Sequence, residues 1–369
     1  FRRVLFRSQK PKVLILGGTG FVGRHLVRYL VENNFASLIR VSDKNRPEMA
    51  WFSEADKELF KNPIVEYVMS NLVNQASVEK TFTLPEGEFD YVIDLASTGP
   101  YGHEQEFYDQ KVLAIVKICA NEAKKRNIKK WIEVSTAQVY DETKKPAKET
   151  DKTKPWTSLA VSKLKAENEL KTIGLPYVIL RPAIIYGPGD INGFMPRIVI
   201  GSVYKHLDKK MKLLWTGSLE QNTVHVNDVV RAIWFLIESG KNGEIYNVVD
   251  ENGTNQEKMN DVIGKFYGIK TGFAGTVMSN LAKIKFKEVV EDVNEGHMEP
   301  WGEMIKNAGI SRSPISPFLE PELLTKNPLN IDGSKLKSLG FKITVSGPTV
   351  ENVRESLNYW LEQKVFPPI

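Results

Sequence analysis

The chain has 369 residues, of which 41% are hydrophobic and 26% charged, and a formal net charge of +5. This length and composition are typical of a globular protein with one large or two modest hydrophobic cores. So small a net charge over a large surface argues against nucleic acid as a partner. The longest apolar runs fall far short of the roughly 18 residues that a membrane span needs.

Cysteine content indicates the compartment. A single cysteine, Cys119, occurs in the chain and allows no internal disulfide. This usage is typical of a reducing compartment, so we expect a cytoplasmic protein. We set residues 1–9 aside as a leader, a tag or a sequence remnant, because FRRVLFRS is rich in arginine and contains no acid. If residues 1–8 are the remnant of a transit peptide, the location is mitochondrial instead.

From residue 10 onwards, short apolar strands alternate with segments of helical periodicity. The expected strands are residues 12–16, 37–41, 64–68, 91–96, 131–135 and 177–181, and the expected helices include residues 22–32, 78–82, 107–126 and 159–172. Continuous apolar strands between helices predict a parallel sheet that is covered on both faces. The fold class is therefore α/β, with a doubly wound parallel sheet.

In the second half of the chain, the regular alternation of strands and helices ends. After Gly187 the pattern predicts isolated strands at residues 210–215 and 243–249, loops and short helices over residues 291–326, and a final helix over residues 350–363. We interpret it as a smaller C-terminal capping domain that binds the substrate.

These patterns divide the chain into two expected domains. Residues 10–186, together with about 224–250, form the dinucleotide-binding domain, and residues 187–223 and 251–369 form the capping domain.

The sharpest local signal is a glycine-rich turn, GGTGFVG, between the first strand and the first helix. Gly17 suits the tight turn, Gly20 lets main-chain N–H groups approach a pyrophosphate, and Gly23 lets helix and strand pack closely. The helix begins at Phe21 and Val22, so its positive end faces the bound anion. This context predicts an NAD(P)-binding Rossmann fold.

Asp43 ends the next expected strand, twenty residues beyond Gly23. A carboxylate there accepts hydrogen bonds from both adenosine ribose hydroxyls and repels a 2′-phosphate. Lys44 and Arg46 follow closely and partly oppose that preference. We therefore expect NAD as the cofactor rather than NADP.

Six motifs occur in order along the chain: GGTGFVG, YVIDLAS, VSTAQVY, SKLKAE, LRPAIIYGPGD and VHVNDVVRA. Together they resemble the extended short-chain dehydrogenase/reductases of the NAD-dependent epimerase/dehydratase family. The resemblance implies oxidoreductase, epimerase or dehydratase chemistry on a hydroxyl or carbonyl substrate. It also implies cofactor contacts at Leu95, Ala96 and Lys163.

The same resemblance implies three catalytic side chains beside the nicotinamide: a tyrosine, a lysine one helical turn later, and a serine or threonine after the fifth strand. Thr136, with Ser135 beside it, matches the serine or threonine, and Lys163 matches the lysine. The tyrosine position is Leu159, which cannot transfer a proton. The active site is therefore atypical for the family.

Two hypotheses follow from Leu159. In the first, the protein is an enzyme in which a water chain or another side chain moves the proton, the candidates being Tyr140, Tyr186, Tyr101 and His103. In the second, the protein keeps the dinucleotide as a structural or sensing ligand. It is then a catalytically inactive scaffold or an accessory subunit of a larger assembly. We favour the first hypothesis.

The substrate class stays open between a nucleotide sugar and a sterol-like molecule. Basic side chains that would suit an anionic substrate lie where relatives bind theirs, at Arg197, Lys205, His206, Lys209 and Lys210.

The five histidines show no metal-ligand spacing, so we expect no metal. Helices 107–126 and 159–172 carry apolar positions that would permit a homodimer.

Overall fold

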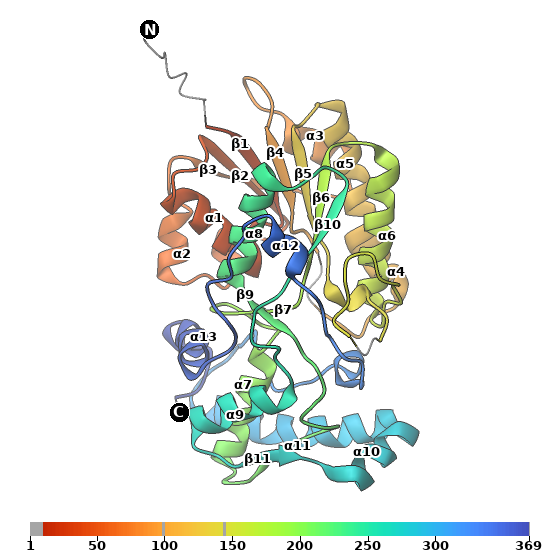
Figure 1. The fold of residues 1–369 in the computed structure, drawn as a ribbon. Coiled ribbons are helices and arrows are strands. Elements are labelled where there is room, and N and C mark those ends of the chain that lie inside the picture. Colours follow the sequence, from red (N-terminus) through yellow and green to blue (C-terminus); the bar gives the residue numbers. More distant parts are fainter. Residues whose placement is uncertain (1–9, 98–99, 143–144, 369) are drawn as a thin grey trace.

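A computed structural model of the chain describes residues 10–97, 100–142 and 145–368 (Figure 1). Residues 1–9, the expected leader, lie outside the described residues. Figure 1 shows a parallel sheet with helices on both faces, and a second group of helices beyond one end of the strands.

Seven parallel strands form the main sheet, in the order β10-β6-β5-β4-β1-β2-β3. Their bounds are β1 Lys12–Leu16, β2 Leu38–Asp43, β3 Val65–Met69, β4 Tyr91–Asp94, β5 Lys130–Val134, β6 Tyr177–Pro182 and β10 Glu244–Val248. The order reverses between β1 and β4, which is where doubly wound sheets bind dinucleotides. The predicted α/β fold class is confirmed.

Strand β10 corrects one prediction. Residues 243–249 are not an isolated strand, because β10 pairs in parallel with β6 along its whole length. Tyr246 and Val248 are buried in the main core, so this short segment completes the sheet.

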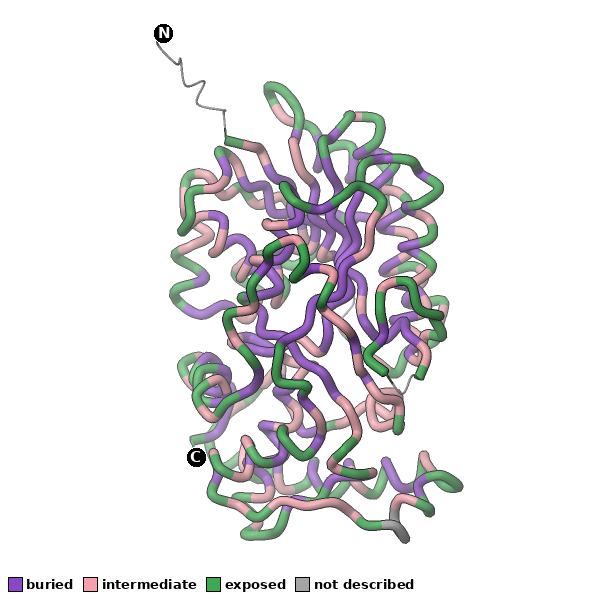
Figure 2. The backbone as a smooth tube through the Cα atoms, in the orientation of Figure 1, coloured by how far each residue is buried: buried purple, intermediate pink, exposed green. Residues whose placement is uncertain are grey.

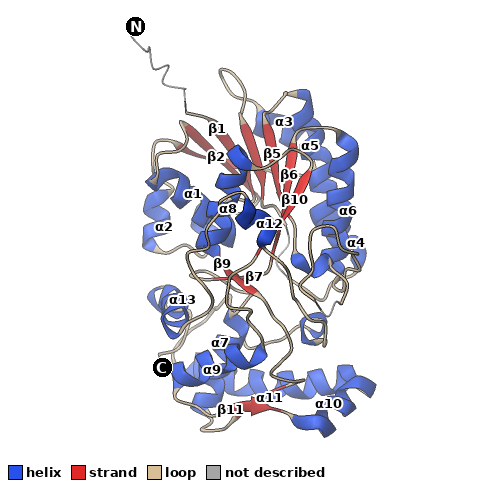
Figure 3. Cartoon of the chain, in the orientation of Figure 1, coloured by secondary structure: helices blue, strands red, loops and turns tan. Residues whose placement is uncertain are grey.

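Helices cover both faces of the sheet (Figure 3). One face packs against α1 (Phe21–Glu32) and α8 (Val226–Ser239), and the other against α3 (Gln75–Phe82), α5 (Ala114–Lys125) and α6 (Ser158–Ile173). Side chains along β1 alternate between the two cores: Val13 and Ile15 face one, Leu14 and Leu16 the other. Figure 2 shows the resulting band of buried residues along the strands.

Shorter helices complete this half of the molecule. They are α2 (Glu54–Leu59), α4 (Gln105–Tyr108), a π-helical turn (Asp109–Leu113) and α12 (Ser334–Ser338). The last helix, α13 (Val350–Glu362), is fixed to the first part of the chain, because the Tyr359 hydroxyl lies 2.6 Å from the Trp51 main-chain oxygen and 2.9 Å from Asp56 Oδ2.

The second group of elements lies beyond the carboxyl ends of the strands (Figure 1). Its helices are α7 (Met195–His206), α9 (Gln256–Tyr267), α10 (Gly275–Ile284) and α11 (Phe286–Asn307). Two short parallel pairs accompany them, β7 (Ile184–Tyr186) with β9 (Thr223–His225) and β8 (Met211–Leu213) with β11 (Thr271–Phe273). A separate apolar cluster, which includes Ile198, Met259 and Trp301, joins α7, α9 and α11.

Helix α11 corrects a second prediction. Loops and short helices are expected over residues 291–326, yet α11 runs for 22 residues and contains Pro300. A buried stripe at Val290, Asn294, His297 and Trp301 explains it, because side chains three or four residues apart share one helix face. Burial of that face outweighs the main-chain hydrogen bond that Pro300 cannot donate.

Candidate functional site

The glycine turn joins β1 to α1 at the point where the strand order reverses. Gly17 has φ +75°, and a Cβ there would lie 2.7 Å from the Cα of Ala96 in the segment after β4. A Cβ on Gly23 would lie 2.5 Å from the Cα of Gly18. Both glycines therefore permit close main-chain contacts inside the protein. Ala96 is buried directly against the turn, and Leu95 beside it is half-buried.

Gly20 plays a different part, because the protein leaves the space around it open. The residue is exposed, and a Cβ there would meet one protein atom, the main-chain oxygen of Gly17, at 3.2 Å. No side chain caps α1, and its first turn holds no acid. The N–H groups of Phe21 and Val22 thus stay available to an anion. This arrangement fits the pyrophosphate of a dinucleotide.

Asp43 lies at the end of β2, beside the glycine turn. Its Oδ2 accepts a hydrogen bond from the Thr19 N–H at 3.3 Å, and its Oδ1 accepts one from the Asn45 N–H at 3.0 Å. The carboxylate is therefore held beside the turn, where the adenosine ribose of a dinucleotide lies in such folds. Lys44 and Arg46 are exposed.

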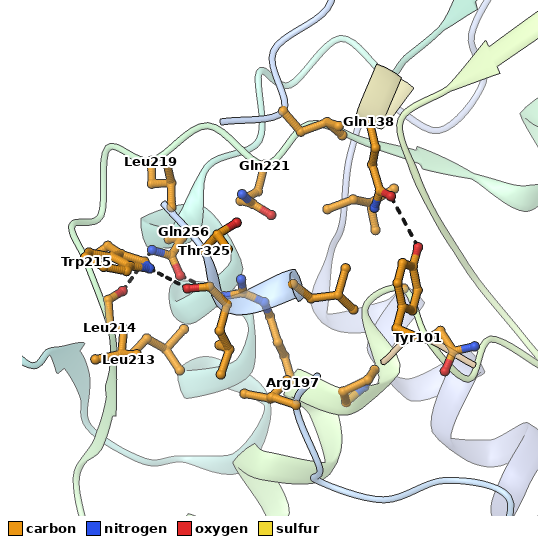
Figure 4. Close-up of a pocket in the computed structure, with 18 of the residues that line it drawn as sticks. Tyr101, Gln138, Arg197, Leu213, Leu214, Trp215, Leu219, Gln221, Gln256 and Thr325 are labelled. Carbon is orange, nitrogen blue, oxygen red and sulfur yellow. Dashed lines mark hydrogen bonds between the residues drawn. The ribbon is translucent and has the colours of Figure 1, made fainter. Parts of the chain in front are cut away.

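A cavity of about 760 Å³ lies between the sheet and the second group of helices (Figure 4). Phe21 and Thr136 line it on the side of the sheet, and Arg197, Gln256 and His297 line it on the side of the helices. Most of the other lining residues are apolar. The cavity therefore adjoins the glycine turn and extends deep into the second half of the chain.

Thr136 and Ser135 follow β5 but differ in what their hydroxyls do. Ser135 donates a hydrogen bond of 2.5 Å to Glu167, which also pairs with Arg181 at 2.5 Å, and all three side chains are buried. Thr136 is half-buried, and its oxygen accepts a hydrogen bond from the Gln138 N–H at 3.2 Å. The Thr136 hydroxyl proton remains free to point into the cavity, which favours Thr136 as the group that orients a substrate oxygen.

Lys163 lies on α6 and is buried. It donates a hydrogen bond to the Val134 main-chain oxygen at 2.7 Å and pairs with Glu133 at 3.3 Å. Asp94, at the end of β4, is also fully buried. Burial, and then the neighbouring Glu133, raises the pKa of Asp94 well above its usual range. The Lys163 ammonium thus lies within a buried acidic cluster and is not among the lining residues.

The four candidates for proton transfer differ in whether they line the cavity. Tyr140 is buried and donates to Asn247 at 2.7 Å, and Tyr186 is buried against His225. His103 is exposed and its ring stacks on Phe107. None of these three lines the cavity.

Tyr101 is the candidate that does line the cavity, and Figure 4 shows its hydroxyl directed toward Gln138. The hydroxyl donates a long hydrogen bond, 3.4 Å, to Gln138 Oε1. Burial raises the pKa of Tyr101 to about 12. Tyr101 therefore stays protonated at neutral pH and can donate a hydrogen bond to an oxygen in the cavity. Leu159, in the first turn of α6, packs against the hydrophobic core between the sheet and helices α3, α5 and α6.

Arg197, on α7, is the basic residue of the second half that the structure brings into the cavity interior. Lys205, His206, Lys209 and Lys210 are exposed on the surface. Arg197 donates to Gln256 Oε1 at 3.2 Å, and desolvation lowers its pKa to about 10.

The family of this chain follows from a comparison of its sequence with known protein families. Residues 13–249 match the NAD dependent epimerase/dehydratase family. The chain belongs to this family. The match covers the glycine turn, Thr136, Lys163 and the strand β10, and it confirms the resemblance to extended short-chain dehydrogenase/reductases.

Two relatives in the family are dehydratases of a nucleotide sugar. A dTDP-D-glucose 4,6-dehydratase from Dictyostelium discoideum is 27% identical over 286 residues, which cover 70% of this chain and 62% of that protein. The chain therefore matches less than two thirds of that relative's length. A dTDP-D-glucose 4,6-dehydratase from Bos taurus is 25% identical over 381 residues, covering 96% of this chain and 90% of that protein.

A solved structure shares this fold. The UDP-glucose 4-epimerase of Thermus thermophilus, crystallised as a complex with NAD, has a TM-score of 0.66 and 19% sequence identity, covering 95% of this chain and 99% of that chain. At this identity the likeness shows the fold alone.

Within the residues that the structure describes, none of the helices is both long and apolar enough to cross a membrane. Within the same residues, His, Cys, Asp and Glu form no group of three that could hold a metal ion.

Two further residues of the site, Gln138 and Gln256, were not predicted from the sequence; they accept hydrogen bonds from Tyr101 and Arg197. Gln138 lies in the motif VSTAQVY, so its position after β5 was a usable signal. Gln256 follows Asn255, whose side chain caps α9, and a helix start at that point could have been predicted from the sequence. Its place in the cavity depends on tertiary contacts that the sequence does not display.

Proposed function

We propose that this protein is an NAD-dependent oxidoreductase, epimerase or dehydratase of a hydroxyl or carbonyl substrate, in which Tyr101 supplies the proton that Leu159 cannot. The observation that carries the proposal is the position of Tyr101, whose hydroxyl faces the cavity beside Gln138. The alternative, an inactive scaffold or accessory subunit, would need no proton donor in this cavity.

The residues around the glycine turn would hold the cofactor. Gly20 exposes the start of α1 to the pyrophosphate, and Asp43 would accept hydrogen bonds from the adenosine ribose. The family and the NAD-bound relative support the same assignment. When bound, NAD supplies a nicotinamide ring that exchanges a hydride with the substrate carbon.

Thr136 and Tyr101 would act on the reacting oxygen. The Thr136 hydroxyl donates a hydrogen bond to it and fixes its position. An alkoxide that forms on this oxygen is more basic than the phenolate of a tyrosine whose pKa is about 12. Proton transfer from Tyr101 to the alkoxide is therefore downhill, which lowers the barrier for reduction of a carbonyl at neutral pH.

Gln138 would position Tyr101. Gln138 Oε1 accepts a hydrogen bond of 2.9 Å from the buried Thr157 hydroxyl, which keeps the amide in place. Its bond to Tyr101 is much longer, at 3.4 Å, and therefore weak. A substrate oxygen can replace Gln138 as the acceptor without breaking a strong interaction.

The test uses the full chain. NADH binding is followed by nicotinamide fluorescence, and reduction of 9,10-phenanthrenequinone, an apolar diketone, by NADH absorbance. We expect Tyr101→Phe to bind NADH as the wild type does and to lower kcat about a hundredfold or more, because general acid catalysis commonly contributes that much. Tyr29→Phe, on α1 and outside the cavity lining, is the matched control and should keep its activity.

Four outcomes decide between the hypotheses. Gly20→Asp should abolish NADH binding without unfolding the chain, because it places a carboxylate against the pyrophosphate. Unchanged kcat in Tyr101→Phe would overturn the role of Tyr101. A wild-type chain that binds NADH but catalyses no reduction would favour the scaffold alternative, which keeps the dinucleotide as a ligand. A folded wild-type chain that binds no NADH would refute the proposed enzyme.

A further inference from the structure

The cavity has two polar regions separated by an apolar wall. Tyr101 and Gln138 lie on one side, and Arg197 and Gln256 on the opposite side, next to Trp215 (Figure 4). Between them the lining is formed largely by leucine, isoleucine and valine side chains from β7, β8, α11 and the segment before α12. Gln221 and Thr325 also line the cavity, but most of the lining is apolar, which suits a ligand with polar ends and a mostly apolar middle.

Arg197 is held in place but lacks an ionic partner. It donates one hydrogen bond, from Nη1 to Gln256 Oε1 at 3.2 Å. The Gln256 amide nitrogen in turn donates to the main-chain oxygens of Leu214 and Thr216, at 3.0 and 3.2 Å, so this acceptor is rigid. Among the described residues, no carboxylate forms an ion pair with Arg197, and none accepts from its Nε or Nη2.

The two acids in the described lining, Asp190 and Asp292, do not compensate Arg197. Asp190 is buried, but its oxygens accept hydrogen bonds from the N–H groups of Gly193, Phe194 and Met195 at 2.7 to 2.9 Å. The Asp190 carboxylate therefore binds main-chain N–H groups at the start of α7 and does not pair with Arg197. Asp292 is exposed, so water screens its charge. Arg197 is half-buried in the cavity lining without a counter-ion, and a ligand anion would supply one.

We propose that the substrate is an amphipathic carboxylate, whose apolar body fills the cavity, whose carboxylate pairs with Arg197, and whose reacting hydroxyl or carbonyl meets Thr136 and Tyr101. This inference deepens the proposed function and rests on it. The guanidinium offers two neighbouring N–H groups, a geometry that suits a carboxylate.

Charge complementarity argues for a carboxylate over the diphosphate of a nucleotide sugar. Arg197 is the one arginine or lysine among the described lining residues that is not exposed, and it balances a single negative charge. Lys212 also lines the cavity, but its side chain is exposed, so it offers little to a buried anion. A diphosphate would bring further charge and many polar atoms against the aliphatic wall, where each unpaired polar group is costly.

The test compares three probes by calorimetric titration of the full chain, with and without saturating NADH. 12-Hydroxydodecanoate has the proposed chemistry, 1,12-dodecanediol lacks its charge, and UDP-glucose is a nucleotide sugar. We expect the acid to bind at least about tenfold more tightly than the diol, since hydrogen bonds to charged groups are the stronger ones. UDP-glucose should bind more weakly than either.

Variants assign the effect to Arg197. Arg197→Gln should bind the acid and the diol with equal affinity, and Arg197→Lys should keep part of the preference for the acid, which guards against misfolding of the first variant. Lys205→Gln, an exposed cation on the same helix, is the matched control and should keep the full preference.

Two results would overturn the inference: a preference for the acid that persists in Arg197→Gln, or tight binding of UDP-glucose with no binding of the acid. Either result leaves NADH binding as an independent measurement. Failure of the substrate class and failure of the proposed enzyme are therefore distinguishable.

Discussion

The ammonium group of Lys163 lies 3.3 Å from Oε1 of Glu133, and both side chains are buried. The ammonium group contacts this carboxylate and also donates a hydrogen bond to the Val134 main-chain oxygen, and both partners belong to strand β5. It therefore stabilises an acidic cluster that would otherwise place Glu133 and Asp94 together without a cation. The structural role of Lys163 is independent of any contact that it makes with a cofactor.

Removal of Lys163 should destabilise the fold strongly. Lys163→Met leaves Glu133 buried and unpaired, so we expect the free energy of unfolding to fall by about 3 kcal/mol or more. Denaturation in urea measures it. Lys165→Met is the matched control on the same helix, because Lys165 is exposed and its ion pair with Asp109, 2.6 Å, should contribute less than about 1 kcal/mol. Equal losses in the two variants would contradict the role of the buried pair.

The two hydroxyls after β5 should differ in their effects. Thr136→Val removes the hydroxyl that faces the cavity, so we expect kcat for quinone reduction to fall about a hundredfold, as for the loss of one oxyanion donor. Ser135→Ala removes a hydrogen bond to Glu167 and should lower stability by about 1 kcal/mol while kcat stays near that of the wild type. A larger loss of kcat in Ser135→Ala than in Thr136→Val would reverse this assignment.

The sequence predicts the sheet and the cofactor region because their signals are local. Short apolar strands, the glycine turn and Asp43 each depend on neighbours within one strand–turn–helix unit. The structure places Gly17 against Ala96 and Asp43 beside Thr19.

The cavity could not be predicted in the same way. Tyr101, Arg197 and Gln256 come from three distant segments, and their proximity depends on how the second group of helices packs. Helix α11 was not predicted for a related reason. Pro300 and many acidic residues are untypical of a buried helix, and the buried face of α11 becomes evident only from its tertiary contacts. Tyr101 can be distinguished from the other three candidates for proton transfer only by its position in the cavity lining.

Two helical glycines should respond to alanine in opposite directions. In Gly23→Ala the new Cβ would lie 2.5 Å from the Cα of Gly18, so we expect a loss of about 2 kcal/mol in stability, typical of overpacking, and weaker NADH binding. Gly296, in α11, has open space around it, because a Cβ there would meet no atom within 4 Å. Gly296→Ala should therefore stabilise the chain by about 0.5 kcal/mol or more, through helix propensity. Thermal melts of both variants measure the contrast, and destabilisation of both by the same amount would contradict it.

His297 should make stability depend on pH. The residue is 4% exposed, its ring packs against Tyr204 at 5.6 Å, and desolvation lowers its pKa to about 4. The folded pKa lies below the unfolded value of about 6.5. The unfolded chain therefore binds more protons between these two values, and stability is lost as the pH falls from about 6.5 toward 4. At pH 5 the loss from His297 amounts to about 2 kcal/mol.

His297→Gln isolates this contribution, because glutamine stays neutral throughout. Unfolding by urea at pH 7 and pH 5 gives the difference in stability between wild type and variant at each pH. We expect that difference to move by about 2 kcal/mol in favour of the variant at pH 5. Asp190, whose pKa burial raises to about 6, acts in the opposite direction but equally in both proteins, so it cancels. His206→Gln, at an exposed site, is the control, and a difference that is the same at both pH values would show that His297 is not desolvated in the folded protein.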